Sequence, residues 1–240
     1  MHQDKKSFRI LGVIPARYNS SRFPGKPLVM IDGKTMLRRV FDQCCKSKLS
    51  DTIIATDDER ILEEVNSWNL NVKCILTSDQ HNSGTDRMFE AIEKYSDVFD
   101  GYINVQGDEP FVEPRTIDSI INTMEVYQDL RVIITIVEEL LPIEFRNRNV
   151  VKALVDADNN ISSFFRSCVY RKNPNIFRHV GIYGMTHSVM EEVKYLKPTE
   201  NENIDKLEQL RWLDNGILIF CDKSDTKSIS IDTPEDLAKI

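Results

Sequence analysis

Short apolar runs alternate with segments of helical periodicity in the first half of the chain. Residues 8–14 (FRILGVI) are an apolar run that ends at Pro15, which is typical of a buried parallel strand. Residues 35–48 place their apolar side chains on one helical stripe, with Thr35 as a candidate N-cap. This order predicts a mainly parallel sheet with helices on both faces. It continues with strands at 52–56, 72–76 and 101–105 and helices around 61–68, 88–95 and 114–127.

The pattern changes after residue 130. Strand-like runs follow one another there with few helical residues between them, at 131–137, 150–156, 161–166 and 179–184. We therefore expect an antiparallel extension or flap at about 131–185. The predicted order closes with helices at about 188–196 and 203–214, strands at 217–221 and 228–231, and a helix from Thr233. Without an internal repeat or a linker, 1–240 is predicted to be a single domain.

The composition is that of a globular chain without a membrane segment. The 240 residues are 41% hydrophobic, which is enough apolar material for a sizeable core. No apolar run approaches the roughly 20 residues of a membrane helix, and Arg17 and Arg22 follow the first apolar stretch in place of a cleavage site. Five cysteines without a CxxC pair indicate reduced thiols. We therefore expect a cytoplasmic protein with no membrane partner.

The formal net charge of −7 conceals a division along the chain. Residues 1–40 contain nine Lys or Arg and two Asp, a net charge of +7, whereas the remainder carries −14. An acidic chain is a poor non-specific ligand for nucleic acid, so we expect no such partner. Three of the N-terminal cations, Arg17, Arg22 and Lys26, fall in one polar loop, which makes that loop a candidate site for an anion.

This loop, at 15–27, follows the first predicted strand. It offers cations, hydroxyls and a glycine within ten residues: Arg17, Ser20, Ser21, Arg22, Gly25 and Lys26. Arginine gives planar bidentate contacts to phosphate and lysine a point charge, so the set suits a polyphosphate. Pro27 follows Lys26 and no glycine stands five residues before Gly25, which excludes a Walker A loop. The alternative is a basic rim that serves solubility.

Carboxylates follow two other predicted strands. Gln106 and Asp108 come directly after the strand at 101–105, and Asp232 follows the strand at 228–231. Ligands of open parallel sheets bind outside the carboxyl ends of the strands, and Mg²⁺ prefers oxygen ligands. Asp108 and Asp232 are therefore candidate Mg²⁺ ligands. For Asp232 the alternative is helix capping, because DTPED combines an N-cap, a proline and first-turn acids.

Other carboxylate pairs are interpreted as structural. Asp156 and Asp158 resemble a metal-binding DxD pair, but the Asn-Asn that follows them favours a tight hairpin turn. Asp57 and Asp58 lead directly into a predicted helix and are interpreted as capping residues. The sequence contains neither a GxSxG nor an HExxH motif, so it gives no support to a serine-elbow hydrolase or a zinc protease.

Five motifs occur in order along the chain: PARYNSSRFPGKPL at 15–28, NVQGDEP at 104–110, HVGIYG at 179–184, LEQLR at 207–211 and IDTPEDL at 231–237. In this combination the chain resembles the 3-deoxy-manno-octulosonate (Kdo) cytidylyltransferases of the CMP-sugar synthetase group, from Ile10 to Leu237. The resemblance implies a Rossmann-like nucleotidyltransferase fold, with a mainly parallel sheet flanked by helices and a smaller antiparallel extension. It also implies a homodimer, with the interface expected at about 131–185.

By this resemblance, CMP passes from CTP to the anomeric hydroxyl of Kdo, pyrophosphate is released, and CMP-Kdo supplies lipopolysaccharide or capsule synthesis. The expected partners are CTP and a 3-deoxy-ulosonic acid, and the expected cofactor is Mg²⁺ on Asp108 and Asp232. Arg17, Lys26 and Asp108 would be the catalytic residues. The nucleotide would contact Ala16, Arg17, Ser21, Arg22, Lys26, Ser83, Gly84, Arg87 and Gln106.

The resemblance further implies a pocket for the sugar acid, formed by Gln106, Arg166, His179, Tyr183, Glu208 and Gln209. His179 and Tyr183 are four residues apart in a predicted strand, so they are expected to share one face. That face could equally be an ordinary half-buried sheet surface. Glu208 and Gln209 could equally be solvent-exposed positions of an amphipathic helix.

Two features depart from the family's pattern. The stretch RSCVYRKNPNIFR at 166–178 lacks R-A-x-I-P, and Met185 stands where an aromatic residue often follows GIYG. Both are expected near the sugar pocket or the flap, so 8-amino-Kdo or another 3-deoxy-ulosonic acid is the alternative acceptor. An alternative of a different class is a non-catalytic nucleotide- or sugar-binding protein. The joint presence of Arg17, Lys26, Asp108 and Asp232 disfavours it.

Overall fold

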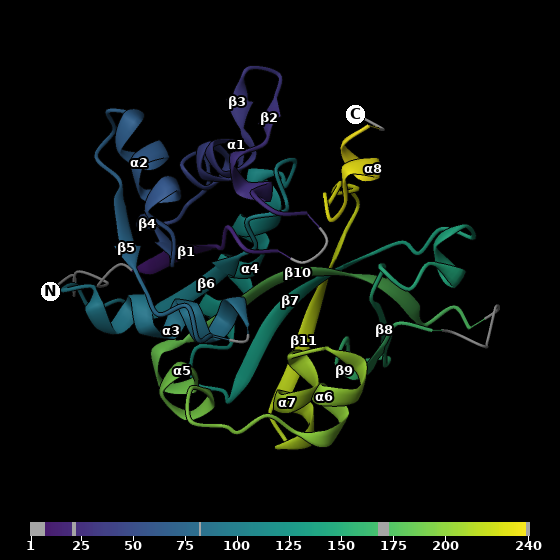
Figure 1. The fold of residues 1–240 in the computed structure, drawn as a ribbon. Coiled ribbons are helices and arrows are strands. Elements are labelled where there is room, and N and C mark those ends of the chain that lie inside the picture. The colour runs from purple at the N-terminus through teal and green to yellow at the C-terminus, as the bar shows by residue number, and fades with distance from the viewer. Residues whose placement is uncertain (1–7, 21–22, 82, 168–172, 239–240) are drawn as a thin grey trace, which may run out of the picture.

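The structure is a computed structural model that describes residues 8–20, 23–81, 83–167 and 173–238. Its centre is one sheet in the order β11-β7-β10-β6-β1-β4-β5, which β8 and β9 extend from β10 (Figure 1). The strands are β1 (Ile10–Ala16), β4 (Asp51–Thr56), β5 (Lys73–Leu76), β6 (Gly101–Val105), β7 (Val132–Glu138), β8 (Lys152–Val155), β9 (Ile161–Phe165), β10 (Ile176–Thr186) and β11 (Leu218–Ser224).

Helices cover both faces of this sheet. The helices are α1 (Met36–Cys44), α2 (Glu59–Ser67), α3 (Gly84–Lys94), α4 (Pro114–Val126), α5 (His187–Val193), α6 (Glu200–Asp205), α7 (Gln209–Asp214) and α8 (Pro234–Leu237). In β1, Ile10 and Ile14 pack against α1, α2 and α4, whereas Leu11 and Val13 pack against the layer of α3, α5 and α7. Because successive strand residues point to opposite faces, a strand between two helical layers must be apolar throughout.

Strand directions confirm the mainly parallel sheet of the first half. β1 pairs in parallel with β4 and β6, and β4 pairs in parallel with β5. β10 runs antiparallel to β6, β7 and β8, while β11 is parallel to β7. Within the predicted extension at 131–185, β7 and β10 therefore belong to the main order of strands, with β10 antiparallel to both neighbours, and β8 and β9 extend the sheet from β10.

Two predicted elements differ in the structure. The predicted helix at 203–214 is interrupted, because Lys206 adopts a left-handed conformation (φ +55°) that separates α6 from α7. The predicted strand at 228–231 is not formed. The backbone N–H of Ser228 donates instead to the Glu138 carboxylate at 2.9 Å, and that of Ile231 donates to the Asp108 carbonyl at 3.0 Å. A short hairpin of β2 (Met30–Ile31) and β3 (Lys34–Thr35) was not expected.

The structural interpretation of the two carboxylate pairs is largely confirmed. Asp58 is the N-cap of α2, and its side chain accepts from the Arg60 backbone N–H at 3.0 Å. Asp156 accepts from the backbone N–H of Asp158 and of Asn160 in the turn between β8 and β9. Asp57 does not cap the helix and instead forms an ion pair with a buried arginine described below.

Cys44, Cys45, Cys74 and Cys221 are free thiols. Across residues 8–20, 23–81, 83–167 and 173–238, no helix has both the length and the apolar character needed to span a membrane.

Candidate active site

A cleft of about 1170 Å³ opens at the carboxyl ends of β1 and β6 and extends along β10 to the start of α7. This is the edge at which open parallel sheets bind ligands. Ser21 and Arg22 lie outside the described residues. All the other predicted site residues line this one cleft: Ala16, Arg17, Lys26, Ser83, Gly84, Arg87, Gln106, Asp108, Arg166, His179, Tyr183, Glu208, Gln209 and Asp232.

Lys26 lies between two carboxylates from distant parts of the chain. Its Nζ is 2.8 Å from Asp108 Oδ2 and 3.4 Å from Asp232 Oδ1, and its side chain is 13% exposed. Burial lowers the pKa of Lys26, but the two carboxylates outweigh burial, so the pKa is raised above its ordinary value. Lys26 is therefore positively charged at neutral pH and holds both carboxylates at one point of the cleft.

The loop from Arg17 to Lys26 turns at Gly25, whose φ of +71° lies in the left-handed region that favours glycine. The Gly25 N–H donates to the Tyr18 carbonyl at 2.9 Å, which closes the loop just before the short helix η1 (Lys26–Leu28). Arg17 is exposed in the cleft, and no hydrogen bond or ion pair to another described residue holds its guanidinium. This cation is therefore available to an anionic ligand.

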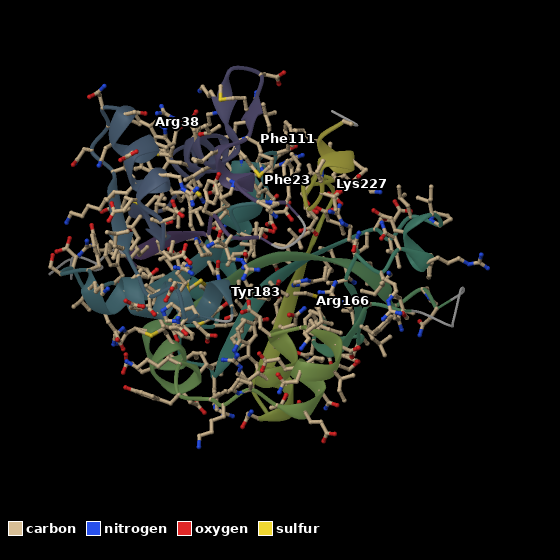
Figure 2. The ribbon with its side chains drawn as sticks, in the orientation of Figure 1. Phe23, Arg38, Phe111, Arg166, Tyr183 and Lys227 are labelled. Atoms are coloured by element: carbon tan, nitrogen blue, oxygen red, sulfur yellow. The ribbon has the colours of Figure 1, made fainter. Side chains whose placement is uncertain are left out.

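Asp232 is placed by the apolar residue before it. Ile231 is fully buried in a small cluster that includes Phe23 and Phe111, which lie close together in Figure 2. The hydrogen bond from the Ile231 N–H to the Asp108 carbonyl then fixes the segment beside the end of β6. Two carboxylates about 120 positions apart in the sequence thereby reach the same cation.

The helix-capping alternative for Asp232 is wrong, because the next residue takes that role. Thr233 is the N-cap of α8, and its side chain accepts from the Asp236 backbone N–H. The Asp236 side chain accepts in return from the Thr233 N–H at 3.1 Å, which completes a capping box. The Asp232 carboxylate points instead toward Lys26.

The donor set at Asp108 and Asp232 fits Mg²⁺. No group of three or more His, Cys, Asp or Glu side chains that could hold a metal occurs in the described part of the chain. Mg²⁺ needs no such cage, because it is usually bound by one or two protein carboxylates and takes its other ligands from substrate phosphates and water. Both carboxylates already share one cation, the Lys26 ammonium, so they can approach a common positive charge.

Gln106 lies between the start of α3 and β10. A Cβ at Gly84 would lie 3.2 Å from both polar atoms of the Gln106 side chain and 3.1 Å from Pro15 Cγ. A Cβ at Gly181 of β10 would lie 3.3 Å from Gln106 Cγ. Glycine thus permits close packing on both sides, and Gln106 stands at the boundary between the predicted nucleotide and sugar halves of the cleft.

Arg87 links the residues that follow β4 to those that follow β5. Its side chain is 3% exposed, and Nη2 lies 2.6 Å from Asp57 Oδ2 just after β4. Nη1 donates to Thr77 Oγ1 at 2.5 Å and to the Ser78 carbonyl at 3.2 Å, both just after β5. Arg87 therefore shapes the loop that precedes α3, and its direct contact with a nucleotide stays a prediction.

His179 and Tyr183 stack on each other, with ring centroids 5.3 Å apart, and Tyr183 meets Trp212 edge-on at 4.8 Å. Residues four apart in a regular strand are about 13 Å apart, so a regular strand does not explain this stack. The register of β10 against β7 shifts between Val180 and Tyr183, and this irregularity brings the two rings together. They form an aromatic wall of the cleft.

His179 is neutral at physiological pH. It is 8% exposed, and burial, aided by the nearby Arg178 charge, lowers the pKa of His179 to about 3. Its Nε2 lies 3.3 Å from Thr135 Oγ1. A neutral imidazole suits a hydroxyl-rich ligand, because it can donate and accept hydrogen bonds without carrying a charge.

Glu208 and Gln209 are not solvent-exposed helix positions, so that alternative is wrong. Gln209 is 4% exposed, and Glu208 Oε1 accepts from Thr85 Oγ1 at 2.7 Å. Burial raises the pKa of Glu208, and hydrogen bonds from Thr85 and Ser83 partly oppose that rise. Glu208 Oε2 is buried and has no hydrogen-bond partner among the described residues.

Arg166 holds the backbone that leads into Glu208. Its Nε donates to the Asp205 carbonyl at 2.9 Å, and its Nη2 donates to the Lys206 carbonyl at 3.1 Å. These carbonyls end α6, where helical hydrogen bonding is incomplete. Figure 2 shows Arg166 and Tyr183 on the side of the sheet where α6 and α7 lie.

Sequence reasoning missed a buried ion pair, Arg178 and Glu138, beside the cleft. Arg178 Nη1 lies 3.0 Å from Glu138 Oε2 and also donates to the Ser228 carbonyl at 2.7 Å. Glu109 is 4% exposed, and burial together with the Asp108 charge raises its pKa to about 8. The signal that could have found the ion pair is a charged residue at the end of an apolar strand, as both Glu138 and Arg178 are.

Of the two departures from the family pattern, Met185 does not reach the cleft. It is completely buried, is paired with Tyr102 and Ile133 in the sheet, and belongs to the core. In the other stretch, residues 168–172 lie outside the described part.

A family model described as cytidylyltransferase matches residues 11–224. The chain is 42% identical over 237 residues to the 3-deoxy-manno-octulosonate cytidylyltransferase of Fusobacterium nucleatum, a match that covers 97% of this chain and 95% of that protein. This chain belongs to the 3-deoxy-manno-octulosonate cytidylyltransferase family. The member from Cytophaga hutchinsonii is 37% identical over 243 residues, 96% of each chain. A solved structure of CMP:2-keto-3-deoxy-manno-octonic acid synthetase complexed with CTP gives a TM-score of 0.87 at 34% identity, over 96% of each chain.

Membership in the 3-deoxy-manno-octulosonate cytidylyltransferase family confirms the resemblance that the five motifs indicated. The Rossmann-like nucleotidyltransferase fold is confirmed as well. The roles of the individual cleft residues, the metal and the dimer stay predictions.

Proposed function

We propose that this protein transfers CMP from CTP to the anomeric hydroxyl of Kdo, with release of pyrophosphate. The observation that supports this most directly is the convergence of Lys26, Asp108 and Asp232 at the carboxyl edge of the sheet, in the same cleft as the Arg17 guanidinium, which pairs with no other described residue. A rim that serves only solubility would not bury a lysine between two carboxylates, because burying charges is costly without a function or close pairing.

On the nucleotide side, Arg17 would bind triphosphate oxygens through its planar guanidinium. Asp108 and Asp232 would hold Mg²⁺, which when bound neutralises phosphate charge. Lys26 keeps the two carboxylates in place and adds a positive charge near the leaving pyrophosphate. The anomeric oxygen attacks the α-phosphorus while the bond to pyrophosphate breaks, so positioning and charge neutralisation suffice without a covalent intermediate.

On the sugar side, Arg166 supplies a positive charge that suits the carboxylate of the sugar acid. The neutral His179 and the Glu208 Oε2 atom supply hydrogen-bonding groups for hydroxyls. Tyr183, with its partner Trp212, offers an apolar surface for the face of the sugar ring. This end of the cleft therefore combines the positive charge of Arg166 with the buried hydrogen-bonding atoms of His179 and Glu208.

The direct test is to incubate the protein with CTP, Mg²⁺ and Kdo and to measure pyrophosphate. We expect release that depends on all three, that EDTA stops and that added Mg²⁺ restores. A panel that includes 8-amino-Kdo and other 3-deoxy-ulosonic acids identifies the preferred acceptor. Absence of release with every acid, alongside an active control enzyme, would contradict the proposed function.

We also propose that the protein forms a homodimer and that its product supplies a glycosyl transfer. A homodimer would use β8, β9 and the neighbouring loop at 139–150, because β7 and β10 are occupied within the main sheet. Sedimentation equilibrium should then give twice the chain mass of 27.8 kDa. CMP-Kdo would serve as a glycosyl donor for lipopolysaccharide or capsule synthesis.

A further inference from the structure

The first turn of α3 carries a buried hydroxyl, that of Thr85, between the side chain of Asn104 and that of Glu208, which lines the cleft. Asn104 Nδ2 lies 3.0 Å from Thr85 Oγ1, which lies 2.7 Å from Glu208 Oε1. Asn104 is in β6 and Glu208 immediately precedes α7, so three separate elements meet at one atom. Asn104 donates to Thr85, and a hydroxyl has a single proton, so that proton is directed to Glu208.

The network is buried, which makes its direction costly to change. Thr85 is 2% exposed and Asn104 0%. Two oxygens in it, Asn104 Oδ1 and Glu208 Oε2, have no hydrogen-bond partner among the described residues. A buried polar atom without a partner costs free energy unless a ligand or water satisfies it. Since Glu208 lines the cleft, its Oε2 is the atom available to a ligand.

The two carboxylate oxygens of Glu208 thus have different hydrogen-bonding roles. Oε1 receives the Thr85 proton and must act as an acceptor. Oε2 remains for the ligand. Ser83, the N-cap of α3, accepts from the Asp86 backbone N–H at 3.0 Å, which fixes the start of the helix that carries Thr85.

We propose that Thr85 and Asn104 are positioning residues that aim Glu208 Oε2 at a hydroxyl group of the sugar acid. This inference rests on the proposed function and deepens it by assigning residues that set acceptor specificity. A site built to hydrogen-bond a hydroxyl discriminates strongly against an analogue that lacks it, because the buried group is then left unpaired. Neither residue contacts the reacting atoms.

The competing explanation is that the network only fastens α7 to α3. The structure provides a matched control, because Arg211 Nη1 of α7 lies 2.9 Å from Asp86 Oδ1 on the same turn of α3. Asp86→Asn weakens that fastening and leaves the Thr85–Glu208 hydrogen bond in place. If fastening were the whole role, Asp86→Asn and Thr85→Val would affect the sugar KM alike.

The test is a double-mutant cycle of Thr85→Val, which removes the hydroxyl at nearly constant shape, and Glu208→Ala, which removes the accepting oxygen. We expect Thr85→Val to raise the sugar KM about ten-fold, the usual effect of losing a hydrogen bond to a charged group, with the CTP KM unchanged. In the Glu208→Ala background the same change should cost less than about two-fold, because the hydroxyl then has no Glu208 oxygen to hold and coupled residues are not additive. Thr85→Ser should restore the wild-type sugar KM.

Equal effects of Thr85→Val in both backgrounds, an equal rise of the CTP KM, or an equal effect of Asp86→Asn would overturn the proposal. Should Thr85→Val fail to fold, Asn104→Leu takes its place in the cycle, since it frees the Thr85 proton to turn away from Glu208. If the wild-type protein released no pyrophosphate with any sugar acid, the proposed function itself would be wrong. The positioning role of Thr85 and Asn104 would then be wrong as well.

Discussion

The two ends of the cleft, predicted to bind the nucleotide and the sugar acid, differ in how far their polar groups are exposed to water. At the nucleotide end, one cluster of charged groups is partly exposed and paired: Lys26 (13%), Asp108 (29%) and Asp232 (19%). At the sugar end the polar groups are buried, as at His179 (8%) and Gln209 (4%). The first cluster keeps its charges near water, where they can exchange partners, whereas the second end removes groups from water, and burial there keeps His179 neutral.

The difference follows from the elements that build each end. The nucleotide end consists of loops after parallel strands, whose termini converge at a sheet edge open to solvent. The sugar end consists of the irregular antiparallel strand β10 and the turn between α6 and α7, packed over the core. Charge neutralisation tolerates solvent, but recognition of hydroxyl groups depends on buried hydrogen-bonding atoms in fixed positions.

The largest effect is expected from Asp108→Asn, which tests the nucleotide end. Turnover should fall about 1000-fold, because loss of a metal ligand removes several kcal/mol of charge stabilisation. The melting temperature should change little, because the Asp108 side chain is 29% exposed. Steady-state pyrophosphate release and calorimetry measure the two, with Asp129→Asn at an exposed position as control. A parallel loss of stability and activity would assign Asp108 a structural role instead.

Lys26→Met should lower kcat/KM for CTP about 100-fold, the effect of removing one preorganised donor. It should also leave Asp108 and Asp232 to repel each other, so Mg²⁺ without nucleotide should raise the melting temperature more in the variant than in the wild type. Thermal unfolding with and without Mg²⁺ measures this, and Lys26→Arg is the control. An identical Mg²⁺ response in both proteins would argue against a shared cation position.

Arg166→Lys tests the sugar end. Lysine cannot reproduce the hydrogen bonds to the Asp205 and Lys206 carbonyls, so the turn before Glu208 should loosen. We expect the sugar KM to rise about ten-fold while the CTP KM stays constant. Initial rates at varied sugar and fixed CTP give the answer, with Arg146→Lys as an exposed control. An equal rise in both KM values would show that the two ends are not separable.

The smallest effect concerns the pH dependence of stability. The pKa of His179 is about 3 in the folded state and 6.5 without burial, so between these values the unfolded state binds more protons. Stability should therefore fall as pH decreases from about 6.5 towards 3. In His179→Gln the slope should be shallower by at most about 1.4 kcal/mol per pH unit, measured by urea unfolding. His187→Gln is the exposed control, and an unchanged slope in His179→Gln would contradict a buried neutral imidazole.

Sequence reasoning was most successful at the nucleotide end, for a physical reason. Apolar runs such as 8–14 and 101–105 mark buried strands, and the termini of parallel strands meet at one edge, so Lys26 and Asp108 could be placed together. The sugar end depends on the register shift in β10 and on the left-handed Lys206, neither of which has a distinctive local pattern. Burial of Glu208 could not be foreseen, because it depends on packing against α3.

On the proposed function, the pair of Lys26 and Asp232 also constrains when activity can arise during synthesis. The two residues are 206 positions apart, and at 5–20 residues per second Asp232 is added roughly 10 to 40 s after Lys26. During that interval β1, β4 and β6 can already pair, but Asp232 is not yet present to join Asp108 and Lys26. A nascent chain can therefore acquire much of its sheet before it acquires a complete site, and the appearance of activity marks the arrival of a segment that contributes almost nothing to the sheet.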